Sequence, residues 1–219
     1  MSPRVLCVEG TKGAGKTTTI AAVRERLGAQ GWTVEVYAPF HAGNEWARTQ
    51  GHEGGVPMME SSPEANRAMV AWLMDAMRAQ RERFLAAHGA SEKPALLIFD
   101  RAWITLHAYL YEGAWARLAR ERDTIDALWS AALAEAPPTF FIHTKPEVTL
   151  RRRAGALDAV SGLQTDARLK SDYERRMALA REHPDRIVRA WETRDETFTD
   201  IAAEVIAWVQ SGSQLSAQC

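Results

Sequence analysis

The residues best suited to do chemistry lie near the amino terminus, in the sequence GTKGAGKT at positions 10–17. This spacing, G-x-x-x-x-G-K-[ST], is typical of a loop whose backbone N–H groups bind phosphate, and its glycines allow the tight turn. The apolar residues 5–8 before it predict a buried strand, and the periodicity of residues 17–27 predicts a helix. The helix N-terminus adds partial positive charge. Residues 10–17, here called the phosphate loop, therefore predict binding of a nucleoside triphosphate.

Two side chains of the phosphate loop have distinct expected roles. Lys16 would reach the β- and γ-phosphates of ATP, and the hydroxyl of Thr17 would be a ligand of Mg²⁺. ATP and Mg²⁺ are therefore the predicted cofactors. The residues expected to contact the nucleotide are Gly10, Lys12, Gly13, Ala14, Gly15, Lys16, Thr17 and Thr18.

A carboxylate and an arginine follow a second apolar run. Residues 95–99 are continuously apolar and lead into Asp100, which is typical of a central parallel strand. Asp100 would either help to hold Mg²⁺ or cap the helix that follows, and we favour the metal role. Arg101 beside it could grip a second phosphate group through paired N–H donors. Lys16, Asp100 and Arg101 are thus predicted catalytic residues.

Three consecutive arginines, at positions 151–153, lie on an expected helix that opens with Pro146. One interpretation is a solvated basic face. The other is a mobile lid, at about residues 151–165, that brings positive charge to the transferring phosphoryl group. We favour the lid, because glycines bracket the segment that follows, and we predict Arg152 and Arg153 as catalytic residues.

The elements expected to position these residues alternate between strand and helix. Further strands are predicted at residues 32–37, 139–143 and 186–190, and helices at about 63–87, 103–120, 124–134, 166–182 and 198–209. Residues 38–62 are expected to be mostly loop, with a short helix at 44–50. The alternation predicts an α/β fold with a parallel sheet covered on both faces, whose ligands gather at the carboxyl ends of the strands.

Composition limits the partners and the compartment. Lys and Arg number 27 and Asp and Glu number 28, for a net charge of −1, so free nucleic acid and anionic membranes are not expected partners. No apolar run is long enough to span a membrane. Cys7 and Cys219 suggest neither a disulfide framework nor a metal site, so we expect a cytoplasmic protein. We expect one domain over residues 1–211 and a disordered tail at 212–219.

Several short motifs occur in the order seen in thymidylate kinases, and the chain resembles that family over nearly its whole length. The motifs are Val8-Glu9-Gly10, Gly13-Ala14-Gly15-Lys16-Thr17-Thr18, Arg78-Ala79-Gln80, Asp100-Arg101, Ala108-Tyr109, Pro146-Glu147 and Gly155-Ala156-Leu157-Asp158. The resemblance implies a P-loop NTPase fold of three layers, with a five-stranded parallel sheet ordered 2-3-1-4-5 and a lid. It also implies transfer of the ATP γ-phosphoryl group to a deoxynucleoside monophosphate with Mg²⁺.

The resemblance further implies an acceptor site. Arg78 would contact the base, Arg101 the acceptor phosphate, and Tyr109 would line the nucleoside pocket. Met74 stands where an aromatic ring commonly stacks on thymine, and Phe40 follows the proline after the second strand without the arginine that is usual there. These five residues are the predicted substrate contacts, and a homodimer is compatible with the resemblance.

The departures from the family lie on the acceptor side. Lys12 replaces a normally acidic residue and would hold an anion, and Leu106 replaces a small polar one. A kinase of the same fold could therefore act on a modified nucleoside or nucleotide, free or within DNA, or on another small hydroxyl compound. For a hydroxyl acceptor, Glu9, Glu45 and Asp100 are candidate bases. A third hypothesis is a regulatory protein that binds nucleotide without transferring a phosphoryl group.

Overall fold

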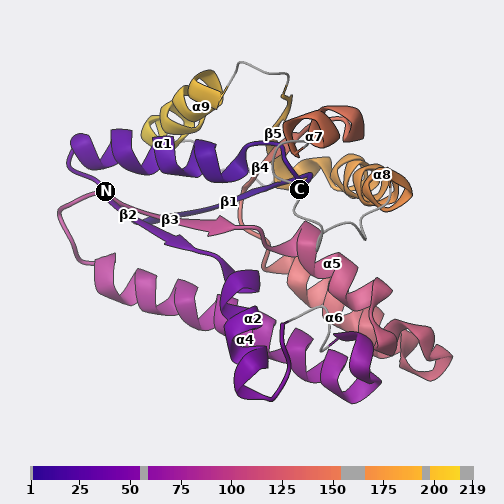
Figure 1. Cartoon of the computed structure of the whole chain (residues 1–219). Helices are drawn as coiled ribbons and strands as arrows, with labels where there is room; N and C mark the ends of the chain where they lie inside the picture. Colours follow the sequence, from indigo (N-terminus) through magenta and orange to yellow (C-terminus); the bar gives the residue numbers. More distant parts are fainter. Residues whose placement is uncertain (1, 55–58, 154–165, 194–197, 213–219) are drawn as a thin grey trace.

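A single parallel sheet organises the chain in the computed structural model, which describes residues 2–54, 59–153, 166–193 and 198–212 (Figure 1). The strand order is β2-β3-β1-β4-β5, which confirms the predicted order. The strands are β1 (Arg4–Gly10), β2 (Thr33–Tyr37), β3 (Ala95–Asp100), β4 (Thr139–His143) and β5 (Ile187–Glu192). Because all neighbouring pairs are parallel, the carboxyl ends of all five strands lie at one edge of the sheet.

Helices cover both faces of this sheet, as predicted (Figure 1). One face is covered by α1 (Lys16–Ala29) and α9 (Phe198–Ser211), and the other by α4 (Pro63–His88), α5 (Trp103–Glu112) and α8 (Asp166–Glu182). Farther from the sheet, α2 (Pro39–Thr49) packs on α4, and α6 (Arg122–Ala134) packs on α5. Helix α7 (Pro146–Arg153) follows β4. None of the helices in the described part of the chain is long and apolar enough to cross a membrane.

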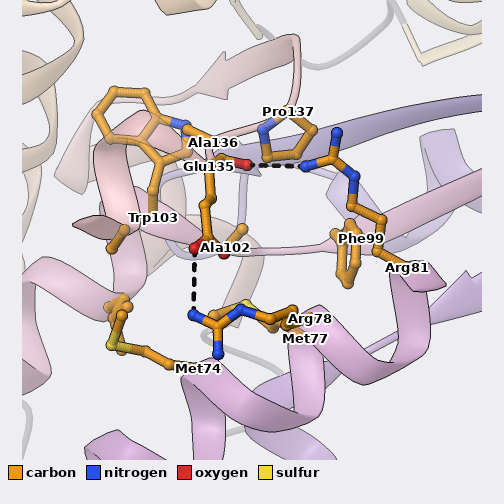
Figure 2. A pocket seen from close by; sticks show the side chains of 12 residues that line it. Met74, Met77, Arg78, Arg81, Phe99, Ala102, Trp103, Glu135, Ala136 and Pro137 are labelled. Atoms are coloured by element: carbon orange, nitrogen blue, oxygen red, sulfur yellow. Dashed lines mark hydrogen bonds and ion pairs between the residues drawn. The ribbon is translucent and has the colours of Figure 1, made fainter. Parts of the chain in front are cut away.

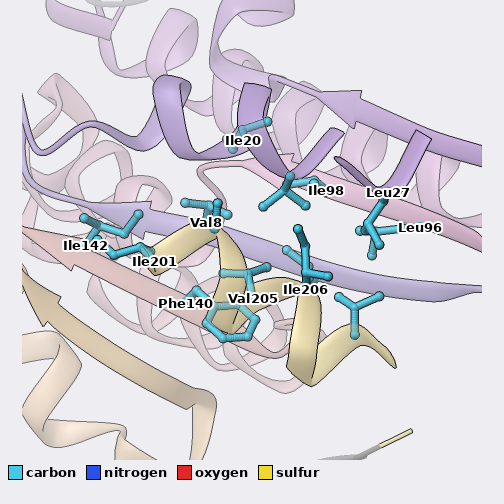
Figure 3. Packing of buried hydrophobic residues seen from close by; sticks show 14 of the residues in the cluster. Val8, Ile20, Leu27, Leu96, Ile98, Phe140, Ile142, Ile201, Val205 and Ile206 are labelled. Carbon is cyan, nitrogen blue, oxygen red and sulfur yellow. The ribbon is translucent and has the colours of Figure 1, made fainter. Parts of the chain in front are cut away.

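Successive strand residues point to opposite faces, and this alternation builds two separate layers of core. Val8 in β1 and Ile98 in β3 pack with side chains of α1 and α9, as Figure 3 shows. Their neighbours Cys7 and Phe99 are buried on the other face, with side chains of α5 and α8. The same alternation decides where the polar residues at the strand ends point.

The segment at residues 38–62 differs from its prediction as mostly loop. Helix α2 begins at once after β2, with a proline in its first turn, which suits that position. Its buried residues include Phe40, Gly43 and Ala47, which recur at helical spacing, so the sequence does carry the pattern of a helix that the loop prediction missed. A Cβ atom at Gly43 would lie 2.7 Å from the Cε atom of Met69, so the glycine allows close packing of α2 on α4.

The helix predicted at residues 103–120 is also shorter than expected. Helix α5 ends at Glu112, and two short 3₁₀ helices follow, η1 (Ala114–Arg117) and η2 (Ala119–Glu121). The break lies where Gly113 passes the fully buried Asn66, whose side-chain oxygen accepts the N–H of Trp115 at 3.0 Å. A Cβ atom at Gly113 would lie 2.3 Å from that oxygen, so the chain must pass this point without a side chain.

Candidate active site

The phosphate loop has the backbone that its glycines predict. Gly10, Gly13 and Gly15 have φ angles of 143°, 74° and 87°, a region that favours glycine. A Cβ atom at Gly10 would lie only 1.7 Å from the carbonyl oxygen of Ile142 in β4, so the first residue of the loop must be glycine for steric reasons as well. The loop then leads directly into α1 at Lys16, as an anion site at a helix N-terminus requires.

Lys16 lies inside the phosphate loop. Its side chain is buried, and its Nζ donates to the carbonyl oxygens of Gly10 at 3.1 Å and Thr11 at 2.7 Å. Burial, together with the nearby cations Arg101 and Arg176, lowers the pKa of Lys16 to about 7. The two hydrogen bonds hold this nitrogen where phosphate oxygens entering the loop could replace its present acceptors, and their negative charge would favour its ammonium form.

Asp100 and Arg101 lie at the same edge of the sheet as the loop, because Val8 pairs with Asp100 in the parallel register. Two residues after Ile98, Asp100 points toward the face covered by α1. Its Oδ1 is buried and has no hydrogen-bond partner among the described residues. Burial raises the pKa of this carboxyl group, against the opposing effect of the Arg101 and Lys16 cations. An unpartnered buried carboxylate oxygen is suited to a cation or a proton.

Arg101 has an unusual backbone conformation. Its φ of 74° is the only positive φ of a non-glycine residue in the described part of the chain, and its N–H donates to Val8 O at 3.1 Å. Such conformations cost about 1–3 kcal/mol and persist where the surrounding structure fixes them, often at functional sites. The turn between β3 and α5 is thus held tightly at the point where the predicted acceptor-binding arginine stands.

Glu9 is fully buried and caps α5. It lies two residues after Cys7 in β1, so its side chain points to the face covered by α5 and α8. Its Oε1 accepts the N–H groups of Ala102 at 2.7 Å and Thr105 at 3.0 Å, and its Oε2 accepts the Thr105 hydroxyl at 3.0 Å. Because both oxygens are engaged, Glu9 is a poorer candidate for a general base than Asp100.

The outer side of the phosphate loop is braced by α7 and by the end of β5. Thr149 donates its hydroxyl to Lys12 O at 2.8 Å, and Arg152 Nη1 donates to Gly13 O at 2.9 Å. The hydroxyl of Thr193 donates to Ala14 O at 3.3 Å. Arg152 thus contacts the backbone of the loop in this structure, and its predicted role at the transferring phosphoryl group stays a prediction. The side chain of Arg153 and residues 154–165 of the predicted lid lie outside the described residues.

A pocket on the expected acceptor side lies among α4, α5 and the end of α6 (Figure 2). Its lining is mostly apolar and includes the predicted contact Met74 and also Leu106. Arg78 lies at this pocket and donates to Glu135 Oε1 at 3.1 Å, an ion pair that Figure 2 shows, and to Asp75 Oδ1 at 3.1 Å. Two predicted substrate contacts, Met74 and Arg78, are therefore brought together, with the arginine already paired to carboxylates.

The other two predicted nucleoside contacts lie beside that pocket and are not part of its lining. The rings of Phe40 and Tyr109 pack with their centroids 5.0 Å apart. Phe40 is buried, and both residues belong to the apolar cluster that contains Met74. In this structure Phe40 and Tyr109 therefore fill space with each other.

Comparisons with known proteins agree with this arrangement. A family model described as an AAA domain matches residues 1–55, and no curated protein matches the chain. The thymidylate kinase from Ehrlichia chaffeensis superposes with a TM-score of 0.53 at 16% identity, covering 96% of this chain and 99% of that chain. The shikimate kinase from Acinetobacter baumannii, in complex with shikimate, superposes with a TM-score of 0.55 at 17% identity, covering 96% of this chain and 94% of that chain.

The chain has a P-loop kinase fold. Both solved kinases match over nearly the whole chain, whereas the family model covers the part that contains the phosphate loop. At such low identity the likeness shows the P-loop kinase fold alone.

The residues present fit the Mg²⁺ that this fold implies. Thr17 is exposed on the first turn of α1, and Asp100 supplies a buried oxygen without a partner. The described residues contain no cluster of three or more His, Cys, Asp or Glu side chains. A Mg²⁺ ion bound with a nucleotide is commonly held by one or two protein oxygens and the substrate phosphates, and Thr17 and Asp100 would supply such oxygens.

Three polar residues of the site escaped the sequence analysis, namely Thr105, Arg176 and Thr193. Thr193 follows the last strand, so the rule that ligands gather at strand ends could have indicated it. Arg176 stands four residues after Asp172 on α8, which on sequence grounds predicts an ordinary surface ion pair. Its burial depends on how α8 meets β1 and α5, and no local pattern carries that information.

Proposed function

We propose that this protein transfers the γ-phosphoryl group of ATP to a small acceptor, in the simplest case the phosphate of a deoxynucleoside monophosphate. The observation that carries the proposal is the meeting of the phosphate loop, containing Lys16, with Asp100 and Arg101 at one sheet edge. The fold shared with a thymidylate kinase supports this acceptor class.

The chemistry follows from these charges. An oxygen of the acceptor phosphate attacks the γ-phosphorus, and the bond from that phosphorus to the β–γ bridging oxygen breaks, which releases ADP. Lys16 stabilises negative charge on the transferring group, and Arg101 holds the acceptor phosphate through its paired N–H donors. Because a phosphate oxygen is already anionic, this acceptor needs no general base.

Thr17 and Asp100 are the residues that would hold Mg²⁺. When bound, the ion supplies neutralisation of charge on the nucleotide phosphates. The hydroxyl of Thr17 and the unpartnered Oδ1 of Asp100 are hard oxygen donors, the type that Mg²⁺ prefers.

A second candidate acceptor is a small molecule with a hydroxyl group, such as a modified nucleoside or nucleotide, free or within DNA. Two observations favour it: Arg78 is paired with Glu135, and Phe40 packs against Tyr109. The shared fold with a shikimate kinase, whose solved complex contains shikimate, also supports a non-nucleotide acceptor.

A hydroxyl acceptor requires a group that takes its proton, and Asp100 is the best candidate, in which case its Oδ1 would take this proton instead of holding Mg²⁺. Burial raises the pKa of its carboxyl group, which makes it a stronger base than an exposed aspartate. Both oxygens of Glu9 are occupied, and Glu45 is exposed on α2 beside His41.

The test is an assay of the purified full chain with MgATP and a panel of nucleosides, nucleoside monophosphates, modified DNA and small hydroxy acids. We expect turnover of at least one acceptor and none with Lys16→Ala, because the γ-phosphate then loses its lysine. Mass spectrometry of the products identifies the acceptor. Nucleotide hydrolysis without transfer to any acceptor would contradict the proposal and indicate a regulatory nucleotide-binding protein.

Arg101→Ala tests the acceptor side separately. Alanine and arginine both carry a Cβ atom and are strained to a similar degree at the φ of 74°. The change therefore removes mainly the guanidinium group. We expect kcat/KM for a phosphate acceptor to fall about 100-fold, as for the loss of a pair of charged hydrogen bonds. Calorimetry should find ATP affinity little changed, and an equal loss of ATP affinity would show that Arg101 does not act on the acceptor.

A further inference from the structure

A buried arginine from α8 reaches the residue that precedes the phosphate loop. The side chain of Arg176 is 10% exposed, and its Nη1 lies 3.7 Å from Glu9 Oε2. The same Nη1 donates to the Thr105 hydroxyl at 2.9 Å, and Nε donates to the two Asp172 oxygens at 2.9 and 3.0 Å. One guanidinium therefore joins β1, α5 and α8.

The contact matters because Glu9 is a fully buried carboxylate, and a buried charge needs a compensating partner. Arg176 lies in ion-pair range of this carboxylate. Two other cations, Lys16 and Arg101, lie close enough to interact with the same carboxylates. Glu9 acts electrostatically on Lys16, and both cations act on Asp100. If Arg176 were removed, these two cations would be the ones available to compensate Glu9.

We propose that Arg176 is a positioning residue that neutralises Glu9 and so keeps Lys16 and Arg101 available for phosphate groups. The inference rests on the proposed function, since it gives those two cations their phosphate partners. The Nε and Nη1 atoms of Arg176 are directed at Asp172 and Thr105. It acts through the charge of Glu9.

The test compares ATP affinity, measured by calorimetry with MgATP on the full chain, in four variants. Arg176→Met removes the cation and keeps most of the side-chain length, and we expect affinity to fall about tenfold as Lys16 turns to Glu9. The double variant, Arg176→Met with Glu9→Gln, also lacks the charge that needs compensation. Its ATP affinity should therefore lie within about threefold of that of the single variant Glu9→Gln. Arg175→Met is the matched control. Arg175 is the neighbouring residue on α8, and it forms an ion pair with Glu112 instead of Glu9.

The outcomes separate this inference from the proposed function. Recovery in the double variant supports the inference, since a purely structural role of Arg176 would not be repaired by changing Glu9. An Arg176→Met affinity equal to that of Arg175→Met, or no recovery in the double variant, overturns it. If the wild type binds ATP without transferring phosphate to any acceptor, the proposed transfer fails while these affinities still decide the inference.

If circular dichroism shows that Arg176→Met does not fold, Arg176→Lys takes its place in the test. Arg176→Lys keeps the positive charge and lacks the planar fork that bonds Asp172 and Thr105. ATP affinity within about threefold of the wild type would support a role for the charge. A tenfold loss would contradict it, because the fork and not the charge would then be what the site needs.

Discussion

At the scale of single residues, the position of Gly10 imposes two constraints that only glycine satisfies. Its φ is 143°, and a Cβ atom would lie 1.7 Å from Ile142 O. We expect Gly10→Ala to lower the free energy of unfolding by at least about 3 kcal/mol, because a backbone atom is hard to displace. Urea denaturation measures this loss, and loss of ATP binding should accompany it.

Gly28 provides the matched control for that substitution. It lies in α1, and a Cβ atom there would meet nothing within 4 Å. Gly28→Ala should therefore raise the free energy of unfolding by roughly 0.5–1 kcal/mol, since alanine favours a helix. Similar losses in both variants would show that the strain at Gly10 has been misjudged.

At the scale of elements, α5 and α6 meet through an aromatic cluster around His107. Its ring stacks on Tyr111 with the centroids 4.4 Å apart and meets the edge of Trp129 at 4.9 Å. The Nδ1 atom is buried without a partner among the described residues. Burial, with the nearby Arg175, lowers the pKa of His107 to about 4. Helices α5 and α6 are therefore packed around a histidine that must stay neutral.

This histidine makes the stability depend on pH in a definite direction. The unfolded chain binds a proton at His107 below pH about 6.5, whereas the folded chain resists it until pH about 4, so acid favours unfolding in that window. Solvent partly screens the charge of this half-buried side chain. We therefore expect the free energy of unfolding of the wild type to fall by about 1 kcal/mol more than that of His107→Phe between pH 7 and pH 5. Urea denaturation at both values measures the difference, and equal losses would contradict the lowered pKa.

At the scale of the whole molecule, the sheet and the phosphate loop were predictable because their signals are local. Alternating apolar runs and turn residues located every strand to within two residues, and Asp100 marked the end of β3. Parallel pairing then brings Asp100 to the loop without further information.

What the sequence did not reveal depends on contacts between distant segments. The packing role of Gly43 is an example, because the close approach that it allows involves Met69 of α4. Arg176 looked like the surface partner of Asp172 until α8 was placed against Glu9. Likewise, the pairing of Arg78 with Glu135 joins α4 to the end of α6, residues far apart in the chain.

The hydrogen bonds from Lys16 to its own loop carbonyls have a consequence for selectivity among anions. An incoming ligand must first displace contacts that already satisfy the ammonium group, so a lone inorganic phosphate gains little net free energy from the exchange. A chain of three phosphates also engages several backbone N–H groups and the helix terminus, and its gain is correspondingly greater. We therefore expect the phosphate loop to favour polyphosphates over single small anions.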